Sequence, residues 1–465
     1  PMKILTLQTY LDGQWLDACV LTFHEPDKGR LGRVSLEYSA SYVAKYQSNL
    51  AARVSMRYPI DFFPHECDVW PAFLFDVMPM GAGRRYWLQR ENLSDGAQQD
   101  LHLLRLGSRS PIGNLRVKES CLNREIAPLG FPMADVLSRD THFLDYAREN
   151  GAAVGGASGA GGDAPKFQLI LGQDGLYYPE ASLPDNEASE FFLVKFPRQS
   201  SSQGSKQGRP LASDILVLET EAAYYRIAKR LGLNVVGHAR YAANQSESAS
   251  VNYFAADEEK LITTPSLWLP RFDRLKNSGD ITRCAIESLY SLVGNTEPGA
   301  TVLHSVYLKQ LADDWRDVGQ EDGVEAMVIE YLCRDLFNVV LGNSDNHGRN
   351  TSIIRSPSGL ELAPIYDLAP MVLDNSGITR TSRWSNENEL GGRYDWRGIC
   401  AEASAATKVN SEALWKGLRD FAKNLAPLKR LAEECGVPDE VLNHQVASLN
   451  LSGTEERLKT WGLLP

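Results

Sequence analysis

Paired cysteines and long apolar runs are both missing from this sequence, and each absence excludes a class of protein. The seven cysteines lie far apart in the 465 residues and form no Cys-x-x-Cys pair, which argues against a disulfide framework and against structural zinc. No apolar run reaches the roughly 18 residues that a membrane helix needs. The first residues lack a basic segment followed by an apolar one, the pattern of a signal peptide. We therefore expect a cytoplasmic globular protein with reduced thiols.

An excess of positive charge is also missing, because the formal net charge is −11. This acidic balance argues against a protein that binds nucleic acid over its whole surface, and no helix-turn-helix pattern is clear. Hydrophobic residues make up 43% of the chain and charged residues 23%, as in ordinary globular proteins. We expect neither direct binding to nucleic acid nor association with a membrane.

The pattern of the chain changes about halfway along its length. Residues 2–23 place apolar residues around an Asp-Gly pair and predict a β-hairpin, and strand-like segments recur up to about residue 275. A helix is clearest at 214–235, and the most apolar helix is predicted at 324–342, where long helical stretches dominate. The sequence therefore predicts an α+β fold with a mixed β/α first half and a mainly helical second half.

The sharpest shift in composition is the Gly/Ala-rich stretch GAAVGGASGAGGDAPKFQLIL at 151–171. A flexible linker and a phosphate-binding loop both have this composition. The stretch leads directly into a strand, which favours the phosphate-binding loop.

A single lysine, Lys195, stands in the apolar strand EFFLVKFP. A lysine among apolar neighbours usually meets an anion, although a lysine on a strand can also face solvent. The following helix carries two early acids, Glu219 and Glu221, and we interpret Glu221 as the partner of Lys195. The alternative is that these acids interact with the helix dipole.

The segment GNSDNHGRN, residues 342–350, follows the most apolar helix and precedes Ile353 and Ile354. Its composition is also that of an ordinary turn. However, Asp345 and Asn350 have the spacing of the kinase catalytic loop. In that loop the carboxylate lies at the acceptor hydroxyl and the amide binds the metal. Asp367, at the end of a strand-like stretch, is the expected second metal ligand. Together with Lys195, these residues predict phosphoryl transfer from ATP with Mg²⁺.

Several segments together resemble the HipA-like serine/threonine protein kinase toxins. The resemblance is carried by SGAGGDAPKFQL, FLVKFP, EAAYYRIAKRLGLNV, LPRFDR, GNSDNHGRN and LAPIYDLAP, and before residue 120 by FDVMPMGAGRRYWLQR and LLRLGSRSPIGNLRV. It implies a two-lobed protein-kinase-like fold. In this fold we assign 1–135 to an extra N-terminal subdomain, 136–268 to the rest of the N-lobe and 269–465 to the helical C-lobe.

The resemblance also implies roles for individual residues. Asp345 matches the catalytic base, Asn350 and Asp367 match the magnesium ligands, and Lys195 matches the lysine that binds phosphate. His347 lies inside the catalytic motif, where we expect it to help order the loop.

Further nucleotide contacts are implied by the same resemblance. Arg271 and Phe272 correspond to the stretch that meets adenine through backbone groups. The Gly-rich loop supplies Gly159, Ala160, Gly161, Gly162 and Lys166. Ser158 is the candidate for autophosphorylation. The loop is richer in glycine than that of the best-known member and one residue longer, which leaves open which serine is modified and whether Lys166 contacts phosphate.

We therefore expect an ATP- and Mg²⁺-dependent kinase that phosphorylates a protein serine or threonine. The resemblance implies an aminoacyl-tRNA synthetase as substrate, growth arrest as the outcome and a DNA-binding antitoxin as partner, although the chain also resembles a stand-alone subgroup. One alternative is a small-molecule or lipid kinase on the same fold. Another is a non-catalytic protein that binds a DNA-binding antitoxin.

Overall fold

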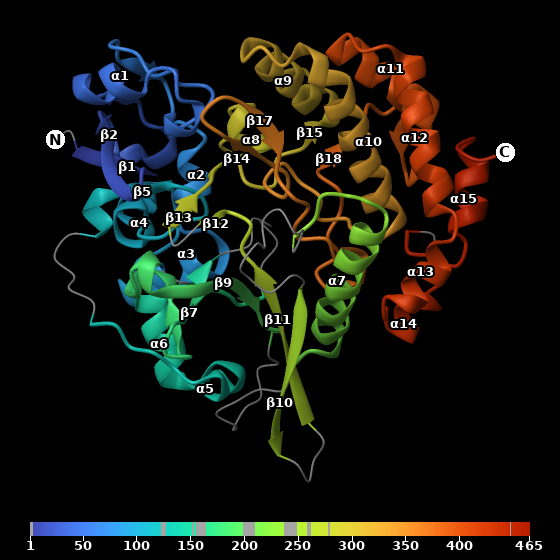
Figure 1. Ribbon diagram of the computed structural model, residues 1–465, viewed down its shortest axis with the longest axis horizontal. Coiled ribbons are helices and arrows are strands. Elements are labelled where there is room, and N and C mark those ends of the chain that lie inside the picture. Colours follow the sequence, from blue (N-terminus) through green and yellow to red (C-terminus); the bar gives the residue numbers. More distant parts are fainter. Residues whose placement is uncertain are drawn as a thin grey trace. The chain divides into compact units, whose positions relative to one another are not determined.

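The chain forms two compact units. Figure 1 labels their helices and strands. The computed structural model describes residues 3–121, 127–150, 153–154, 164–198, 210–236, 249–257, 262–277, 280–446 and 448–465. The first unit comprises Pro1–Pro210, Val236–Pro298 and Ser352–Gly359, and the second comprises Leu211–Val235, Gly299–Thr351 and Leu360–Pro465.

The first unit begins with the predicted hairpin, which is confirmed. Its two strands pair antiparallel around Asp12 and Gly13, both of which adopt the positive φ angles that such a tight turn needs. They belong to a five-stranded sheet in the order β4-β3-β2-β1-β5. The strands are β1 Lys3–Leu11, β2 Gln14–Phe23, β3 Val34–Tyr38, β4 His65–Cys67 and β5 Leu115–Val117.

This sheet has a hydrophobic core of its own. The buried residues of the core all lie between Leu5 and Val117, and its largest members include Trp70 and Phe73. Four helices accompany the sheet: α1 Ala40–Tyr46, α2 Leu74–Val77, α3 Gly81–Arg90 and α4 Asp100–Gly107. A core confined to one stretch of sequence allows this part to pack as a layer of its own.

A second sheet follows in the same unit, with the strand order β10-β11-β9-β7-β6 and with β8 paired to β7. Phe167, Phe192 and Trp268 pack on one side of it, together with side chains from two short helices. The helices are α5 Met133–Ser138 and α6 Thr141–Glu149. The strands are β6 Ala153–Val154, β7 Lys166–Gly172, β8 Tyr177–Pro179, β9 Ala188–Lys195, β10 Ser250–Asp257 and β11 Ile262–Pro270.

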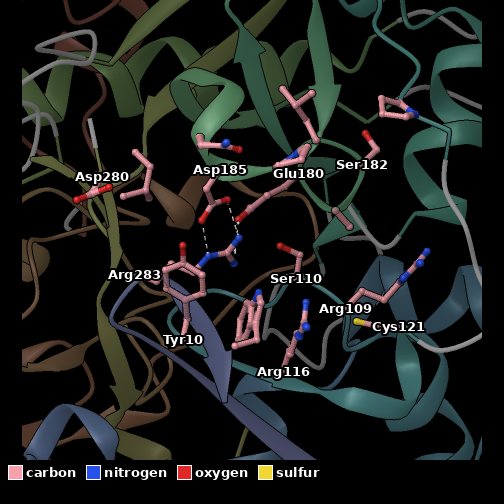
Figure 2. Close-up of a pocket in the computed structure, with 18 residues that line it drawn as sticks. Tyr10, Arg109, Ser110, Arg116, Cys121, Glu180, Ser182, Asp185, Asp280 and Arg283 are labelled. Atoms are coloured by element: carbon pink, nitrogen blue, oxygen red, sulfur yellow. Dashed lines mark hydrogen bonds and ion pairs between the residues drawn. The ribbon is translucent and has the colours of Figure 1, made fainter. Parts of the chain in front are cut away.

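The first unit also contains two small antiparallel pairs and a cavity. The pairs are β12 Arg274–Asn277 with β13 Asp280–Arg283, and β14 Ala285–Ser288, which precedes α8 Leu289–Leu292, with β16 Ser352–Arg355. Figure 2 shows the cavity, of about 750 Å³, which is lined by residues of β1, β2 and β5 on one side and by residues 180–186 on another.

The second unit is mainly helical. Its central helix, α10 Val324–Val340, is buried along almost its whole length and packs against α9, α11 and α12. The other helices are α7 Ala212–Arg230, α9 His304–Asp317, α11 Trp396–Thr407, α12 Ser411–Leu425, α13 Leu428–Glu434, α14 Asp439–Leu442 and α15 Thr454–Thr460. Its short strands are β15 Val302–Leu303, β17 Leu360–Leu362, β18 Ser382–Arg383, β19 Glu389–Leu390 and β20 Arg393–Tyr394.

The predicted α+β class is confirmed. The units differ from the predicted consecutive ranges, because each unit combines segments that are far apart in the sequence. Residues 269–298, assigned from the sequence to the helical lobe, lie in the first unit because their strands pair there. Helix α7 lies in the second unit, where the Tyr224 hydroxyl donates to the carbonyl of Leu341 at 2.9 Å. No helix among the described residues combines the length and the apolar character that crossing a membrane requires.

A buried ion pair joins β14 to β16 in the first unit. Glu287, 1% exposed, pairs with Arg355, which is equally buried. The same carboxylate accepts hydrogen bonds from the Ser55 and Ser291 hydroxyls and from the Met56 N–H. A carboxylate this deeply buried stays charged only because a cation and several donors replace its water.

Replacing Arg355 with methionine should therefore lower the free energy of unfolding by about 3–5 kcal/mol, because Glu287 is left buried without its cation. Urea denaturation followed by circular dichroism measures this loss. The control is Lys28→Met, which removes the exposed ion pair of Lys28 with Glu25 and should leave the unfolding midpoint unchanged. Equal midpoints for both variants would contradict this account of the pair.

Candidate functional site

The loop with the predicted catalytic residues leaves the end of the buried helix α10 through Gly342. This glycine has a φ of +69°, and a Cβ added to it would lie 3.0 Å from the Ser448 carbonyl oxygen and 3.0 Å from Val372. Both the left-handed backbone and the crowding require glycine here. The chain therefore turns away from the apolar helix at Gly342, and the polar residues of the loop follow directly after this turn.

Asn343 organises this loop from a buried position, with 3% of its surface exposed. Its side-chain Nδ2 donates to Asn338 Oδ1 of α10 at 2.7 Å and to the carbonyl oxygen of Asp367 at 3.1 Å. Its Oδ1 accepts the backbone N–H of Asp345 at 3.3 Å. One amide therefore holds the helix, the backbone of Asp345 and the backbone of Asp367 in a common arrangement.

The side chain of Asn350 is bonded to the backbone of Asp345, while the roles predicted for the two side chains stay predictions. The Asn350 Nδ2 donates to the backbone carbonyl of Asp345 at 2.7 Å, and the Asn350 N–H donates to the carbonyl of His347 at 2.8 Å. The Asp345 side chain is 19% exposed. Because the amide nitrogen of Asn350 faces the loop, its Oδ1 is the atom suited to a metal ion.

His347 is buried in the loop, with 4% of its side chain exposed. The backbone N–H of Arg349 donates to its Nδ1 at 3.2 Å, so the neutral ring carries its proton on Nε2. That Nε2 lies 3.7 Å from the Asp345 carboxylate. These contacts support the expected role in ordering the loop, while a contact of His347 with ATP stays a prediction.

Asp367 lies in the second unit on a segment that is tied to the same loop. Its φ of +50° is in the left-handed region, which aspartate tolerates better than most residues. The Tyr366 hydroxyl donates to the Arg349 carbonyl at 2.8 Å, and the Ile365 N–H donates to the Asn234 carbonyl at 2.9 Å. The segment that leads into Asp367 is thus held by hydrogen bonds of Ile365 and Tyr366, and the Asp367 carbonyl by Asn343.

Glu221 lies on α7 of the second unit, 3% exposed, where the Tyr225 hydroxyl donates to its Oε1 at 2.6 Å. Burial raises the pKa of Tyr225, and the nearby carboxylates of Glu221 and Asp367 raise it further. Glu221 is therefore a neighbour of the Asp367 region. The predicted pair of Glu221 with Lys195 would join the two units and stays a prediction.

The two predicted lysines stand directly opposite each other in the first unit. Lys166 begins β7 and Lys195 ends β9, and the two residues are cross-strand partners in the antiparallel register. Directly opposite residues project from the same face of a sheet, where like charges destabilise each other unless an anion lies between them. This register is therefore suited to a phosphate group.

The predicted Gly-rich loop joins the antiparallel strands β6 and β7, in which Val154 pairs with Lys166. A Gly-rich connection between antiparallel strands that ends at a lysine is suited to cradling phosphates. The loop residues themselves lie outside the described part of the chain: Ser158, Gly159, Ala160, Gly161 and Gly162.

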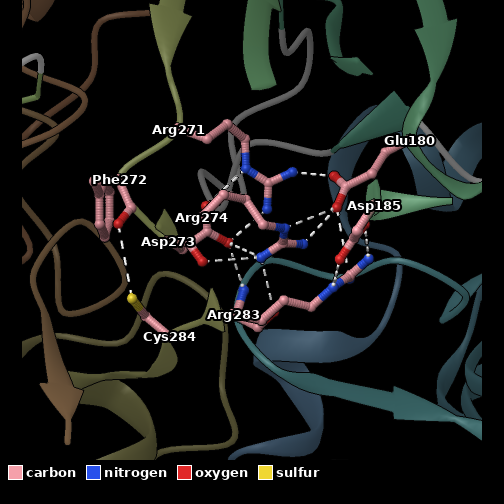
Figure 3. Close-up of polar contacts among 9 residues, drawn as sticks. Glu180, Asp185, Arg271, Phe272, Asp273, Arg274, Arg283 and Cys284 are labelled. Carbon is pink, nitrogen blue, oxygen red and sulfur yellow. Dashed lines mark hydrogen bonds and ion pairs between the residues drawn. The ribbon is translucent and has the colours of Figure 1, made fainter. Parts of the chain in front are cut away.

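Arg271, predicted to contact the nucleotide, points its side chain into a network of buried ion pairs. The guanidinium of Arg271 pairs with Glu180 and Asp273, as Figure 3 shows. The backbone N–H of Arg271 donates to the Phe191 carbonyl at 3.0 Å. Burial alone would raise the pKa of Asp273, but Arg271 and Arg274 hold it well below its usual range. A contact with adenine at Arg271 would therefore have to use its carbonyl oxygen, and Phe272 likewise stays a prediction.

The predicted magnesium ligands are one amide and one carboxylate. The described residues contain no cluster of three or more His, Cys, Asp or Glu side chains placed to hold a metal. Mg²⁺ is commonly bound by one or two protein oxygen ligands, with substrate phosphates and water completing the shell. Asn350 Oδ1 and the Asp367 carboxylate fit that donor set.

Sequence analysis missed Asn338, Asn343 and Tyr225 as organising residues. Asn343 looked like one more turn residue in GNSDNHGRN, yet it makes the contacts that hold the loop. The available signal was Asn338, a polar residue in the apolar run DLFNVVLG, because a buried amide requires a polar partner nearby.

The fold and the sequence both have counterparts among known proteins. The fold is similar to a chain of the solved complex of the Shewanella oneidensis MR-1 toxin–antitoxin system HipA, HipB and its operator DNA. The TM-score is 0.59 at 17% identity, over 98% of this chain and 96% of that chain. The molecule thus has an α+β fold similar to that of the matched chain.

The model of the HipA-like C-terminal domain matches residues 158–427, more than half of the chain. The chain belongs to this HipA-like family. It is also 28% identical over 218 residues to a protein of Sinorhizobium fredii with the name "Putative kinase Y4mE". That match spans 45% of this chain and 46% of the relative, so about half the length of each protein is aligned.

The hydrogen bonds of Asn343 can be tested by removing its amide. Asn343→Ala should lower the free energy of unfolding of the second unit by about 1–3 kcal/mol, because buried partners are left unsatisfied. It should also speed hydrogen exchange at the backbone amides of 343–350, measured by mass spectrometry.

Asn346→Ala is the matched control, since the Asn346 side chain makes no hydrogen bond among the described residues. Its exchange rates should equal those of the wild type. Unchanged exchange in both variants would show that Asn343 does not hold the loop.

Proposed function

We propose that this protein is an ATP- and Mg²⁺-dependent serine/threonine protein kinase of the HipA type. The observation that carries the proposal is the shared support of Asp345 and Asp367 by Asn343, with Asn350 bonded to the backbone of Asp345. Phosphoryl transfer needs a carboxylate at the acceptor hydroxyl and oxygen ligands for the metal, held in constant geometry. Asp345, Asn350 and Asp367 are proposed to supply these groups.

In the proposed reaction, Asp345 orients a serine or threonine hydroxyl and accepts its proton as the oxygen bonds to the γ-phosphorus of ATP. The bond from that phosphorus to the β,γ-bridging oxygen breaks, and ADP leaves. His347, whose Nε2 faces the Asp345 carboxylate, keeps this side chain oriented. Bound Mg²⁺, held by Asn350 Oδ1 and Asp367, would neutralise the charge that develops on the phosphate oxygens.

Lys195 is proposed to bind the phosphates of ATP, assisted by Lys166. Their opposed register in β7 and β9 supports this role, because two cations on one face of a sheet favour an anion between them. The Gly-rich loop Gly159–Gly162 is proposed to donate backbone N–H groups. Glu221 is proposed to orient Lys195, and Arg271 and Phe272 to meet adenine through their backbone.

The substrate is proposed to be a bacterial protein, with an aminoacyl-tRNA synthetase as the leading candidate and growth arrest as the consequence. This follows from the resemblance to the HipA toxins. A DNA-binding antitoxin is the proposed partner, and it is supported by the similarity in fold to a chain from a complex that contains HipB and operator DNA. Phosphoproteomics after expression would distinguish a protein substrate from a small molecule or a lipid.

Removing either proposed carboxylate should abolish the reaction while the protein remains folded. Asp345→Asn and Asp367→Asn should each lower ³²P transfer from ATP to lysate proteins by about 10²–10⁴-fold, the range typical for loss of an acid–base group or a metal ligand. Thermal denaturation checks that both variants fold.

The matched control is Asp322→Asn, which changes an exposed aspartate of the same unit and should keep wild-type activity. Wild-type transfer in both Asp345→Asn and Asp367→Asn would overturn the proposed kinase. A folded wild-type protein that binds HipB-like partners without any transfer would favour the non-catalytic alternative.

Ser158 is proposed to be modified by the protein itself. Phosphorylation would add nearly two negative charges to a loop built to receive phosphate, and we expect ATP binding to be lost. Intact-mass spectrometry should show a phosphate on the wild type that is absent from Ser158→Ala. It should also be absent from Asp345→Asn if the modification is autocatalytic, and a phosphate retained on Ser158→Ala would exclude this serine.

A further inference from the structure

The cavity of the first unit has the size of a small-molecule site, with a volume of about 750 Å³. Residues of β1, β2, β5, β13 and the segment 180–186 line it. Its lining contains none of the described residues that are proposed to bind ATP or metal. A ligand of this cavity would therefore occupy a second site.

Three arginines face this cavity: Arg109, Arg116 and Arg283 (Figure 2). Burial lowers the pKa of Arg116, and the positive charges of Arg283 and Arg109 lower it further, against the opposing effects of Cys121 and Asp17. The guanidinium groups are thus close enough to repel one another. The same lining contains three acids, Glu180, Asp185 and Asp280, so the charge left at the cavity depends on which arginines these acids meet.

Aromatic rings hold two of these guanidinium groups in position. The Arg116 guanidinium lies 4.1 Å from the centre of the Trp15 ring, and that of Arg283 lies 4.9 Å from the same centre. The Arg283 group is also 5.1 Å from the Tyr10 ring, and Arg116 Nε donates to Gln8 Oε1 at 2.7 Å. The rings are therefore covered by cations, which makes them supports for arginine and not a stacking surface for a base.

The acidic side chains that line the cavity either form ion pairs with arginines or are exposed to solvent. Glu180 pairs with Arg271 and Arg274 (Figure 3), and Asp185 accepts two bonds from Arg283 at 2.8 and 2.9 Å. The remaining acid, Asp280, is exposed. Within the described part of the chain, Arg116 has no carboxylate within 4.0 Å. Its charge is not neutralised by these acids.

Two buried donors at the cavity have no hydrogen-bond acceptor among the described residues: Ser110 Oγ and Arg283 Nη1. Ser110 is 5% exposed, and Arg283 Nη1 lies 3.6 Å from Glu180, beyond hydrogen-bond distance. An unsatisfied buried donor costs about 1–3 kcal/mol. Figure 2 shows Ser110 between the arginines and the Glu180–Asp185 side of the cavity.

We propose that this cavity binds a phosphate group, either free phosphate or the phosphate of a small ester, through Arg116, Arg283 Nη1 and Ser110 Oγ. The three donors come from separate parts of the first unit: β5, β13 and the segment after α4. Donors that converge from several directions suit a tetrahedral anion with four acceptor oxygens better than a planar carboxylate. The site is independent of the proposed kinase reaction.

Isothermal titration calorimetry on the full chain tests this site, with inorganic phosphate and AMP as the two probes. Both should bind the wild type if phosphate esters are accepted, whereas binding of inorganic phosphate alone would restrict the site to the free ion. Arg116→Gln and Ser110→Ala should each weaken binding tenfold or more. Arg105→Gln, which changes an exposed arginine outside the cavity, should bind like the wild type.

Lys195→Gln separates this site from the proposed ATP site, and the component of phosphate binding that Arg116→Gln and Ser110→Ala weaken should persist in Lys195→Gln. If circular dichroism shows that Arg116→Gln is unfolded, the test of the phosphate site uses Ser110→Ala, which removes only a hydroxyl. The proposal is overturned if neither probe binds the wild type at millimolar concentration. It is equally overturned if Ser110→Ala and a folded Arg116→Gln bind both probes like the wild type, or if only Lys195→Gln weakens them.

Discussion

The buried side-chain amide of Asn343 is the contact on which the polar loop of the second unit depends. A loop with several polar residues has to leave the most apolar helix of the chain without stranding its own backbone groups in the core. Asn343 satisfies that requirement, because it bonds to Asn338 in the helix and to the backbones of Asp345 and Asp367. The two carboxylates of the proposed mechanism therefore share one support, although they are 22 positions apart in the sequence.

Charge is arranged in two contrasting ways in the first unit. Glu180, Asp273, Arg271 and Arg274 neutralise one another in the core, and that network stabilises the packing around β12 and β13 without leaving charge for a ligand. Elsewhere cations are held close together: Lys166 stands opposite Lys195 on β7 and β9, and Arg116 and Arg283 lie over the same Trp15 ring. Like charges held close together cost free energy, so these two places are where an anion gains most by binding.

Local elements and the local turn of GNSDNHGRN could be predicted from the sequence. The helix predicted at 324–342 is observed at Val324–Val340, and Asp345 and Asn350 are bonded because five positions are within reach of one turn. Other features could not be predicted. The side chain of Arg271 pairs with Glu180, 91 positions away, and the unit to which 269–298 belongs depends on strand pairing. The local pattern of apolar residues indicates neither the partner of Arg271 nor the strands with which 269–298 pair.

The sequence by itself determined the α+β class, the helix and strand periodicities and the family resemblance. Only the tertiary structure decided that Lys166 stands opposite Lys195, that Asn343 carries the loop, and that three arginines and Ser110 surround one cavity. The reason is physical. Periodicity reports which face of an element is buried, whereas register and long-range packing decide which distant side chains meet there.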